Sequence, residues 1–175
     1  LEFSDQPKDE FMANMKKANK ELVAARPTAV NLSWAVNRME NLLEENKEKI
    51  RGLIFSHGHE DHVGAIPYLL QKINPPLYGT DFTIEMIKDR IQNFNLPENP
   101  ELNIIKDGSS PLKLNSFKID FCHLNHSIPG ALAIKIDTPS GAIIYTGDYK
   151  FDQTPLYHPQ TNYQKLSRWA QSKIL

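Results

Sequence analysis

The chain has 175 residues, of which 40% are hydrophobic, so it can bury one core with a small appendage but not two independent enzymes. Lys and Arg number 20, Asp and Glu number 21, and the formal net charge is -1. These charges are scattered, which excludes the global basic footprint of a dedicated nucleic-acid binder. A single cysteine, Cys122, excludes an intramolecular disulfide. No leader or long apolar span is visible, and we therefore expect a soluble, cytoplasmic protein with no membrane partner.

The first part of the chain predicts two antiparallel helices. One helix is expected over residues 9–25 and the other begins near Pro27, because a proline ends one helix and suits the first turn of the next. Each carries an apolar stripe at helical spacing, formed by Phe11, Met15, Ala18 and Leu22 in the first and by Leu32, Ala35, Met39 and Leu42 in the second. We interpret both stripes as core-facing surfaces.

The remainder alternates strands and helices and then becomes mostly strands. Strands are predicted at residues 53–55 and 77–78, each followed by a helical pattern, over residues 63–73 and 81–94. Further strands are predicted at 102–105, 112–114, 117–123, 132–136 and 142–145. Tyr163, Leu166, Ala170 and Ile174 predict a closing helix. The fold class is therefore α/β, of the α+β kind.

A cluster of ligand-type side chains follows the first of these strands, in the hexapeptide His57-Gly58-His59-Glu60-Asp61-His62. His57 and His59 are two residues apart, so both can reach one ion, while Asp61 and His62 can point toward a second ion beside it. The alternative is a polar loop with solvated histidines. Three of the six histidines and two carboxylates within six residues favour a metal-binding turn. We do not expect Glu60 to be a ligand.

The HxHxDH pattern after a strand resembles the signature of the metallo-β-lactamase superfamily. The segments His126-Ser127-Ile128-Pro129 and Thr146-Gly147-Asp148-Tyr149-Lys150-Phe151-Asp152 resemble ribonuclease J, a branch of that superfamily that cuts RNA. This resemblance covers residues 43–175 and implies a truncated metallo-β-lactamase-like half sandwich. It also implies that His126 joins His57 and His59 on one ion and that Asp148 bridges both ions.

The resemblance also indicates what this chain lacks. The family closes its second ion with a further histidine downstream and carries an inserted substrate-binding domain, and the sequence ends before either. We therefore expect a tight zinc site formed by His57, His59, His126 and Asp148, with manganese as an alternative metal. A second, weak site is left with Asp61, His62, Asp148 and water. His123 and His158 are spare histidines, and His123 is expected to alternate inward with Phe117, Ile119 and Phe121 or to lie exposed.

A different resemblance precedes the nuclease-like part. The segment Arg26-Pro27-Thr28-Ala29-Val30-Asn31-Leu32-Ser33-Trp34-Ala35 resembles methylthioribose-1-phosphate isomerase, and the similarity spans residues 11–39. Arg26 matches the position that helps to hold the sugar phosphate in that family. The family's catalytic cysteine and aspartate lie in a domain absent here, so we expect no isomerase activity. These observations predict a chimera of residues 1–42 and 43–175, with the helical hairpin packed on the truncated sheet.

The chemistry implied is metal-assisted hydrolysis of a phosphodiester, with Asp61 orienting the attacking water or accepting its proton. Three interpretations stay open. The chain is a metal-binding ribonuclease J-like fragment with weak or no turnover, a non-catalytic recombined protein, or another metallo-β-lactamase-fold hydrolase or oxidoreductase. RNA or another phosphodiester is the partner in the first case. Exposed sheet edges left by the truncation predict a homodimer.

Overall fold

The computed structural model describes Lys17, Lys20, Trp34, Arg38, Met39 and residues 41–43, 45–106, 108–156 and 158–175. The chain divides into two compact units, Leu1–Ile50 and Arg51–Leu175. In the first unit, a short 3-10 helix, η1, spans Lys47–Lys49. Most of the predicted N-terminal helical pair lies outside the described residues, so the packing of that pair on the sheet stays a prediction.

The second unit begins with a three-stranded parallel sheet. Its strands β1 (Leu53–Ile54), β2 (Leu77–Gly79) and β3 (Leu102–Ile104) lie in the order in which they occur in the chain. Parallel neighbours require crossover connections. Helices α3 (Glu60–Val63) and α4 (Ile66–Leu70) lie in the first connection and α5 (Asp81–Ile91) lies in the second. The alternation of strands and helices predicted for this part is confirmed.

A four-stranded antiparallel sheet follows, in the order β4-β5-β6-β7. Its strands are β4 (Leu112–Leu114), β5 (Phe117–His123), β6 (Leu132–Thr138) and β7 (Gly141–Tyr145). Asn115, with a φ of 53°, lies in the tight turn between β4 and β5. Asparagine tolerates this left-handed conformation better than most residues do. All four predicted strands are confirmed: β4 and β5 have the predicted bounds, β6 ends two residues later than predicted and β7 begins one residue earlier.

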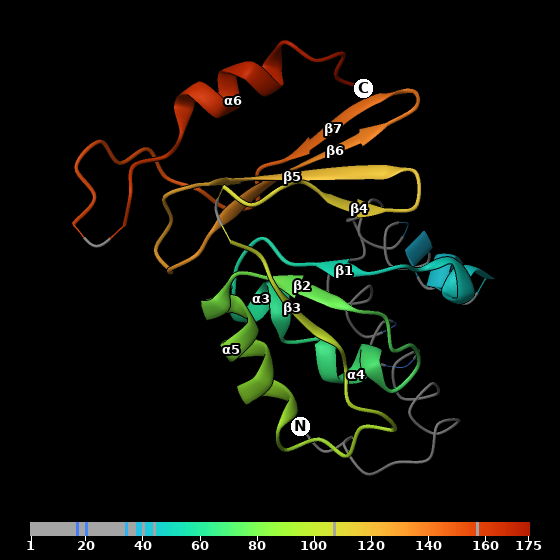
Figure 1. Ribbon diagram of the computed structural model, residues 1–175. Coiled ribbons are helices and arrows are strands. Elements are labelled where there is room, and N and C mark those ends of the chain that lie inside the picture. The colour runs from blue at the N-terminus through green and yellow to red at the C-terminus, as the bar shows by residue number, and fades with distance from the viewer. Residues whose placement is uncertain are drawn as a thin grey trace. The chain divides into compact units, whose positions relative to one another are not determined.

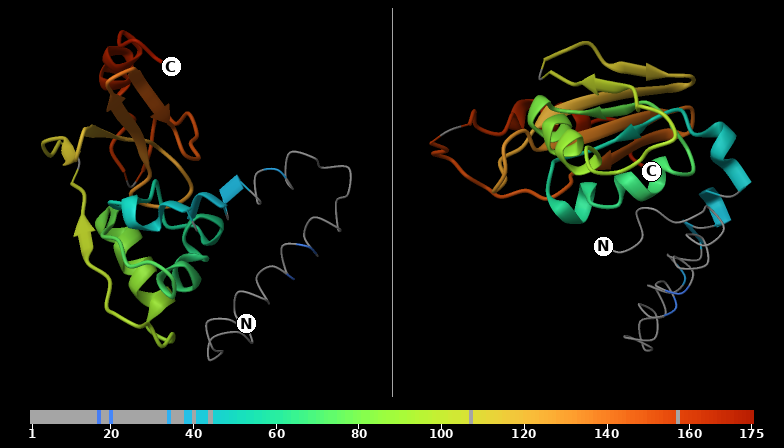
Figure 2. Two further views of the ribbon diagram at one scale, coloured as in Figure 1. Left: turned by 90° about the vertical axis from the view of Figure 1, so that its right-hand side faces the viewer. Right: turned by 90° about the horizontal axis from the view of Figure 1, so that it is seen from below.

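Side chains alternate across the first sheet and thereby separate two apolar layers. Leu53 and Leu77 pack with the helices, in a cluster with Val63, Ile66, Leu70, Ile84 and Ile87. Ile54 and Tyr78 point the other way and pack with Ile119, Phe121, Leu132 and Ile134 of the second sheet. Figures 1 and 2 show the result, with α4 and α5 outside one sheet, α6 (Tyr163–Ala170) outside the other, and the two sheets between them. The predicted α/β class is confirmed.

Helix α6 is fixed to the second sheet by an apolar contact and a polar one. Trp169 and Leu166 pack on Cys122 and Ala133. Beside them, the Asp120 carboxylate accepts hydrogen bonds from Trp169 Nε1 at 3.0 Å and from the backbone N–H of Phe121 at 2.9 Å, and it pairs with Lys165 Nζ at 2.8 Å. Burial raises the pKa of Asp120, but the hydrogen bonds from Lys165, Trp169 and Phe121 have the larger combined effect. The pKa of Asp120 is therefore below its ordinary value.

Replacing Asp120 by Ala should destabilise the protein by about 2 kcal/mol, because the buried Trp169 and the partly buried Lys165 lose their common acceptor. Urea unfolding measures this loss. Glu85→Ala is the matched control: Glu85 pairs with Lys88 at 2.6 Å on the exposed face of α5, where such pairs contribute little. Equal losses in the two variants would contradict the anchoring role of Asp120.

Two predictions for this unit are wrong. Ile174 is not on the closing helix, which ends at Ala170; instead it forms a parallel β-bridge with Ala142, supported by the hydrogen bond from Leu175 N–H to the Ala142 carbonyl at 3.0 Å. Phe117 does not alternate inward with its neighbours, because it begins β5 at the sheet end and is 45% exposed. His123 does lie inward and is 8% exposed.

Among the described residues, no helix is both long and apolar enough to cross a membrane.

Candidate metal centre

The predicted ligands come from three segments that each follow the end of a strand. His57, His59, Asp61 and His62 follow β1, His126 follows β5 and Asp148 follows β7. The backbone N–H of Leu132, the first residue of β6, donates to the Ser56 carbonyl at 2.8 Å and thereby joins the second sheet to the segment after β1. Side chains from distant parts of the chain can therefore converge here while the strand backbones stay paired.

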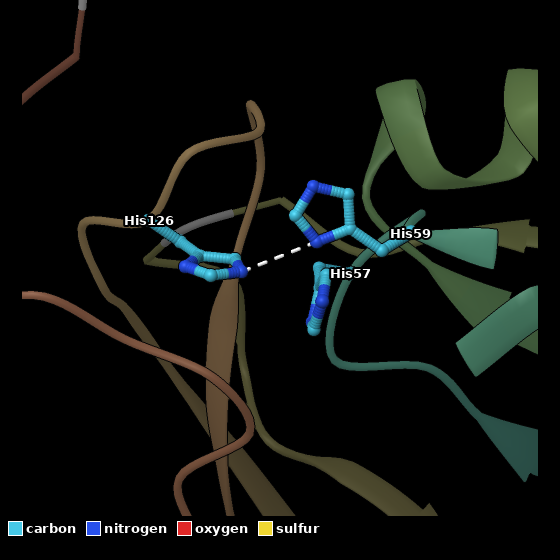
Figure 3. Close-up of side chains that lie close together, drawn as sticks. All are labelled: His57, His59 and His126. Atoms are coloured by element: carbon cyan, nitrogen blue, oxygen red, sulfur yellow. Dashed lines mark hydrogen bonds between the residues drawn. The ribbon is translucent and has the colours of Figure 1, made fainter. Parts of the chain in front are cut away.

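The first group of converging side chains consists of His57, His59 and His126 (Figure 3). One ring nitrogen from each lies within 4.8 Å of the others, as three ligands of one ion require. His126 Nε2 and His59 Nδ1 are 3.2 Å apart. The His57 ring lies edge-on to both others, with its centroid 4.8 Å from that of His59 and 4.9 Å from that of His126. We call these three residues the first triad.

A second group consists of His57, His62 and Asp148, and we call it the second triad. The ring centroids of His57 and His62 are 4.0 Å apart. Asp148 Oδ2 lies 3.8 Å from His62 Nε2 and 3.9 Å from His126 Nε2, between the two triads. The resemblance to ribonuclease J implies that Asp148 is the ligand shared by both ions. In the structure His57 belongs to both groups, and Asp148 lies beside the first triad.

His57 provides the observation that tests whether this site fits a metal ion. The residue is fully buried, and its Nδ1 is 3.1 Å from Ser56 Oγ. Its Nε2 is buried and has no hydrogen-bond partner among the residues that the structure describes. A buried polar atom without a partner is costly in an ordinary core. If Nδ1–H donates to Ser56 Oγ, Nε2 presents a free lone pair, the form that a metal ligand needs. The side chains present therefore fit a metal ion.

The same surroundings keep the imidazole of His57 neutral. Burial, and then the nearby His62, His126 and His59, lower the pKa of His57 to about 4, against a smaller opposing effect of Asp148. Burial and His59 are likewise the main causes that lower the pKa of His126. Neutral imidazoles coordinate metals, whereas protonated ones cannot.

We expect the metal-free protein to lose stability when the pH falls from about 6.5 to about 4. The pKa of His57 is 6.5 in the unfolded chain and about 4 in the folded one, so the unfolded state binds the extra proton first. The contribution of neutral His57 to the free energy of unfolding is complete above pH 6.5, the pKa in the unfolded chain. It is lost as the pH falls through the folded-state pKa of about 4, and the total loss is roughly 3 kcal/mol. Urea unfolding with a chelator present, compared between wild type and His57→Asn, measures it. Parallel pH curves for the two proteins would contradict this assignment.

The other polar residues of the turn lie outside both triads. The Asp61 carboxylate is 3.5 Å from His62 Nε2, and its side chain is 77% exposed, so it faces solvent beside the second triad. Glu60 pairs with Arg90 of α5.

The two spare histidines, His123 and His158, lie outside both triads as well. His123 Nε2 lies 3.1 Å from the Pro159 carbonyl oxygen, and the centroid of its ring is 6.5 Å from that of His158.

One residue that the sequence analysis did not single out, Asn125, connects the segments that carry the proposed ligands. Asn125, which precedes His126, is 2% exposed, and its Oδ1 accepts from the backbone N–H of Thr161 at 3.0 Å and from Thr161 Oγ1 at 3.1 Å. Its carbonyl accepts from the N–H of Lys150 at 2.7 Å, two residues after Asp148. Asn125 therefore ties the segment carrying Asp148 to the segment carrying His126.

A glycine permits the close approach of these segments. Gly147 has a φ of +58°, a conformation that most residues avoid, and a Cβ placed there would lie 2.8 Å from the Ser56 Cβ. Because glycine has no side chain, the segment that carries Asp148 can pack against Ser56, whose Oγ contacts His57 Nδ1. The glycine before Asp148 is therefore explained by its backbone conformation and by close packing against Ser56.

Comparison with curated proteins identifies relatives among ribonucleases. Ribonuclease J of Helicobacter pylori (strain ATCC 700392 / 26695) is 35% identical over 133 residues, which are 76% of this chain and 19% of that protein. Ribonuclease J 2 of Staphylococcus aureus (strain MRSA252) is 38% identical over 130 residues, 74% of this chain and 23% of that protein. The chain thus spans about a fifth of the length of the curated relatives it matches.

Solved structures share the arrangement of layers. A HARLDQ-motif metallo-beta-lactamase mutant, S60, from Cronobacter sakazakii superposes with a TM-score of 0.53 at 16% identity, covering 74% of this chain and 55% of that one. The metallo-beta-lactamase fold protein YhfI from Bacillus subtilis gives 0.50 at 24% identity, covering 66% and 48%. These likenesses confirm the predicted fold. Residues 27–164 match the family described as the metallo-beta-lactamase superfamily, and this protein belongs to that superfamily.

Proposed function

We propose that this protein is a metal-dependent hydrolase of phosphodiesters in RNA, of the ribonuclease J kind. The observation that carries the proposal is that two groups of donor side chains share the buried His57, whose Nε2 has no hydrogen-bond partner among the described residues. The identity of 35–38% to ribonucleases J supports RNA as the substrate class. It does so over about a fifth of those proteins, so the activity of a whole ribonuclease J is not carried over directly.

In this proposal each side chain has a stated task. His57, His59 and His126 would hold one divalent ion, and because the imidazole of His57 has one free lone pair, His62 and Asp148 with the neighbouring Asp61 would be left for a second. Bound ions supply Lewis acidity toward the phosphoryl oxygens and lower the pKa of water. Asp61, exposed and 3.5 Å from His62, orients the attacking water and accepts its proton. Asn125 and Gly147 hold His126 and Asp148 in place.

We propose zinc as the metal, with manganese as a substitute. Three imidazoles and one carboxylate around a site suit zinc, whereas a carboxylate-rich set would suit magnesium or manganese better. The second triad shares His57 with the first and is otherwise reduced to His62 and the exposed Asp148. We therefore propose that the first ion binds tightly and the second weakly.

Turnover on RNA should be low. A weak second ion provides only part of the charge stabilisation that a pair of ions gives, and RNA cleavage also needs groups that position the strand. The same reasoning leaves small activated phosphodiesters as substrates, because they need the ions but no extended groove.

The interpretation as a chimera belongs to this proposal as well. It rests on the resemblance of residues 11–39 to methylthioribose-1-phosphate isomerase, while the superfamily match begins at residue 27 and so overlaps that segment. A homodimer formed through exposed sheet edges and a cytoplasmic location complete the proposal.

The decisive experiment compares substrates with zinc or manganese added to the purified chain. We expect slow hydrolysis of bis(p-nitrophenyl) phosphate, trace cleavage of 5′-labelled RNA, and loss of both in Asp61→Ala. Hydrolysis of a thioester in preference to both phosphodiesters would overturn the proposal. Turnover of neither phosphodiester, with metal bound, would favour a non-catalytic protein.

A further inference from the structure

Three aromatic side chains form a continuous exposed strip beside the metal centre. They are Tyr149, Phe151 and Tyr163, and we call them the aromatic strip. The rings of Tyr149 and Phe151 meet edge to face with centroids 5.5 Å apart, and those of Phe151 and Tyr163 lie nearly parallel at 6.5 Å and 18°. Their exposed fractions are 49%, 78% and 41%.

Such a strip is unusual on a protein surface. Single exposed apolar residues are common, whereas exposed rings in contact with one another mark a surface that binds something. Phe151 in particular leaves most of an apolar ring in water, at a cost that burial beneath a neighbouring loop would remove.

The strip is connected rigidly to the proposed ligands. Tyr149 directly follows Asp148, and the next residue, Lys150, donates its N–H to the Asn125 carbonyl at 2.7 Å. The other end of the strip begins α6 just after Thr161, which is bonded to the Asn125 side chain. The chain segments at both ends of the strip are thus tied to Asn125, the residue that precedes His126, and so to the loop that carries a proposed ligand.

The charges near the strip favour stacking over attraction to phosphate. Lys150, the cation between Tyr149 and Phe151 in the sequence, is paired with Asp152 at 3.1 Å. Its charge is therefore balanced locally, and the strip offers chiefly flat aromatic faces. Proteins that bind single-stranded nucleic acid use such faces to stack successive bases, whatever the base sequence.

We propose that the aromatic strip is a stacking platform for nucleobases of single-stranded RNA next to the phosphodiester held at the metal centre. This inference rests on the proposed function and adds to it the part of the substrate that is recognised. Tyr149 directly follows Asp148, about 3.8 Å away along the backbone, so the strip begins within reach of a nucleotide next to a phosphodiester held at Asp148. The platform supplies binding that the donor triads alone cannot give.

The test measures binding without catalysis. The full chain is stripped of metal with a chelator, and its binding to fluorescently labelled oligouridine is followed by anisotropy at low salt. An abasic strand of equal length keeps the phosphates and lacks the bases. We expect Phe151→Ala to weaken binding to oligouridine by roughly 5-fold or more and to leave the weaker binding to the abasic strand unchanged.

Two further variants make this result specific. Phe151→Trp keeps a flat ring and should retain binding, with its added indole emission quenched by the stacked base. Phe117→Leu, at an exposed ring on the far end of β5 from His123, should bind as wild type does. Because both sites are solvent-facing, neither variant should change the melting temperature appreciably.

The inference is overturned if wild type binds the abasic strand as well as oligouridine, or if neither strand binds. It is also overturned if light scattering shows a dimer that Phe151→Ala dissociates, since the strip is then covered by a second copy. If only the proposed function is wrong, the result differs: the metal-loaded chain does not hydrolyse bis(p-nitrophenyl) phosphate, but RNA binding still depends on the bases.

Discussion

Simultaneous replacement of His57 and His59 by Ala should abolish tight zinc binding. The double variant removes two of the three nitrogens of the first triad and the residue common to both triads, so neither group retains three donors. Wild type at neutral pH should carry at least one tightly bound zinc ion per chain, and the variant none. Mass spectrometry under native conditions and elemental analysis measure this stoichiometry.

Zinc should also raise the melting temperature of wild type but not of the double variant. The donors come from segments that meet only in the folded chain, so binding stabilises the folded state by about 2.7 kcal/mol at a zinc concentration about 100 times the Kd. His158→Ala is the matched control, because His158 lies outside both triads, and it should behave as wild type. Wild type with less than one tight ion per chain would refute the metal centre.

Asp148→Ala should leave one bound ion and lower phosphodiester hydrolysis by about 100-fold or more. The first triad is complete without Asp148, whereas the second loses its only carboxylate. The same change removes negative charge from between His62 and His126, 3.8 and 3.9 Å away. Steady-state hydrolysis of bis(p-nitrophenyl) phosphate, together with zinc stoichiometry, measures both effects.

The control for this variant is Asp137→Ala. Asp137 pairs with Lys135 near the end of β6 remote from Leu132 and Ser56, and its loss should leave rate and stoichiometry unchanged. If Asp148→Ala hydrolysed the ester at the wild-type rate, the second triad would have no part in the reaction. If it lost all zinc, the first triad would not suffice by itself.

The sequence predicts the elements of the second unit well because their signals are local. Period-two strands and short amphipathic helices are visible in windows of a few residues. Ile174 shows where this fails: it lies four residues after Ala170, at helical spacing, but pairing with Ala142 determines its conformation. Such a contact depends on a partner 32 residues earlier, and no local pattern contains it.

The residues of the site likewise differ in how far the sequence alone identifies them. His57, His59 and His62 are recognisable because they lie within six residues, whereas His126 is 67 residues from His59 and only family resemblance connects them. Asn125 and Ser56 could not have been found from spacing. Asparagine and serine are common loop residues, and their importance here comes from hydrogen bonds to Thr161 and His57 that exist only in the folded chain.

Asn125 also bears on how fast a metal ion could bind. Its bonds to Thr161 and Lys150 involve no ligand side chain, so they persist whether or not an ion is present. The loops that carry His126 and Asp148 are therefore ordered in advance, and the ion does not have to recruit them from a broad ensemble. The entropic cost of assembling the site is met during folding, and capture of the ion then depends on its diffusion and on the loss of its own hydration water.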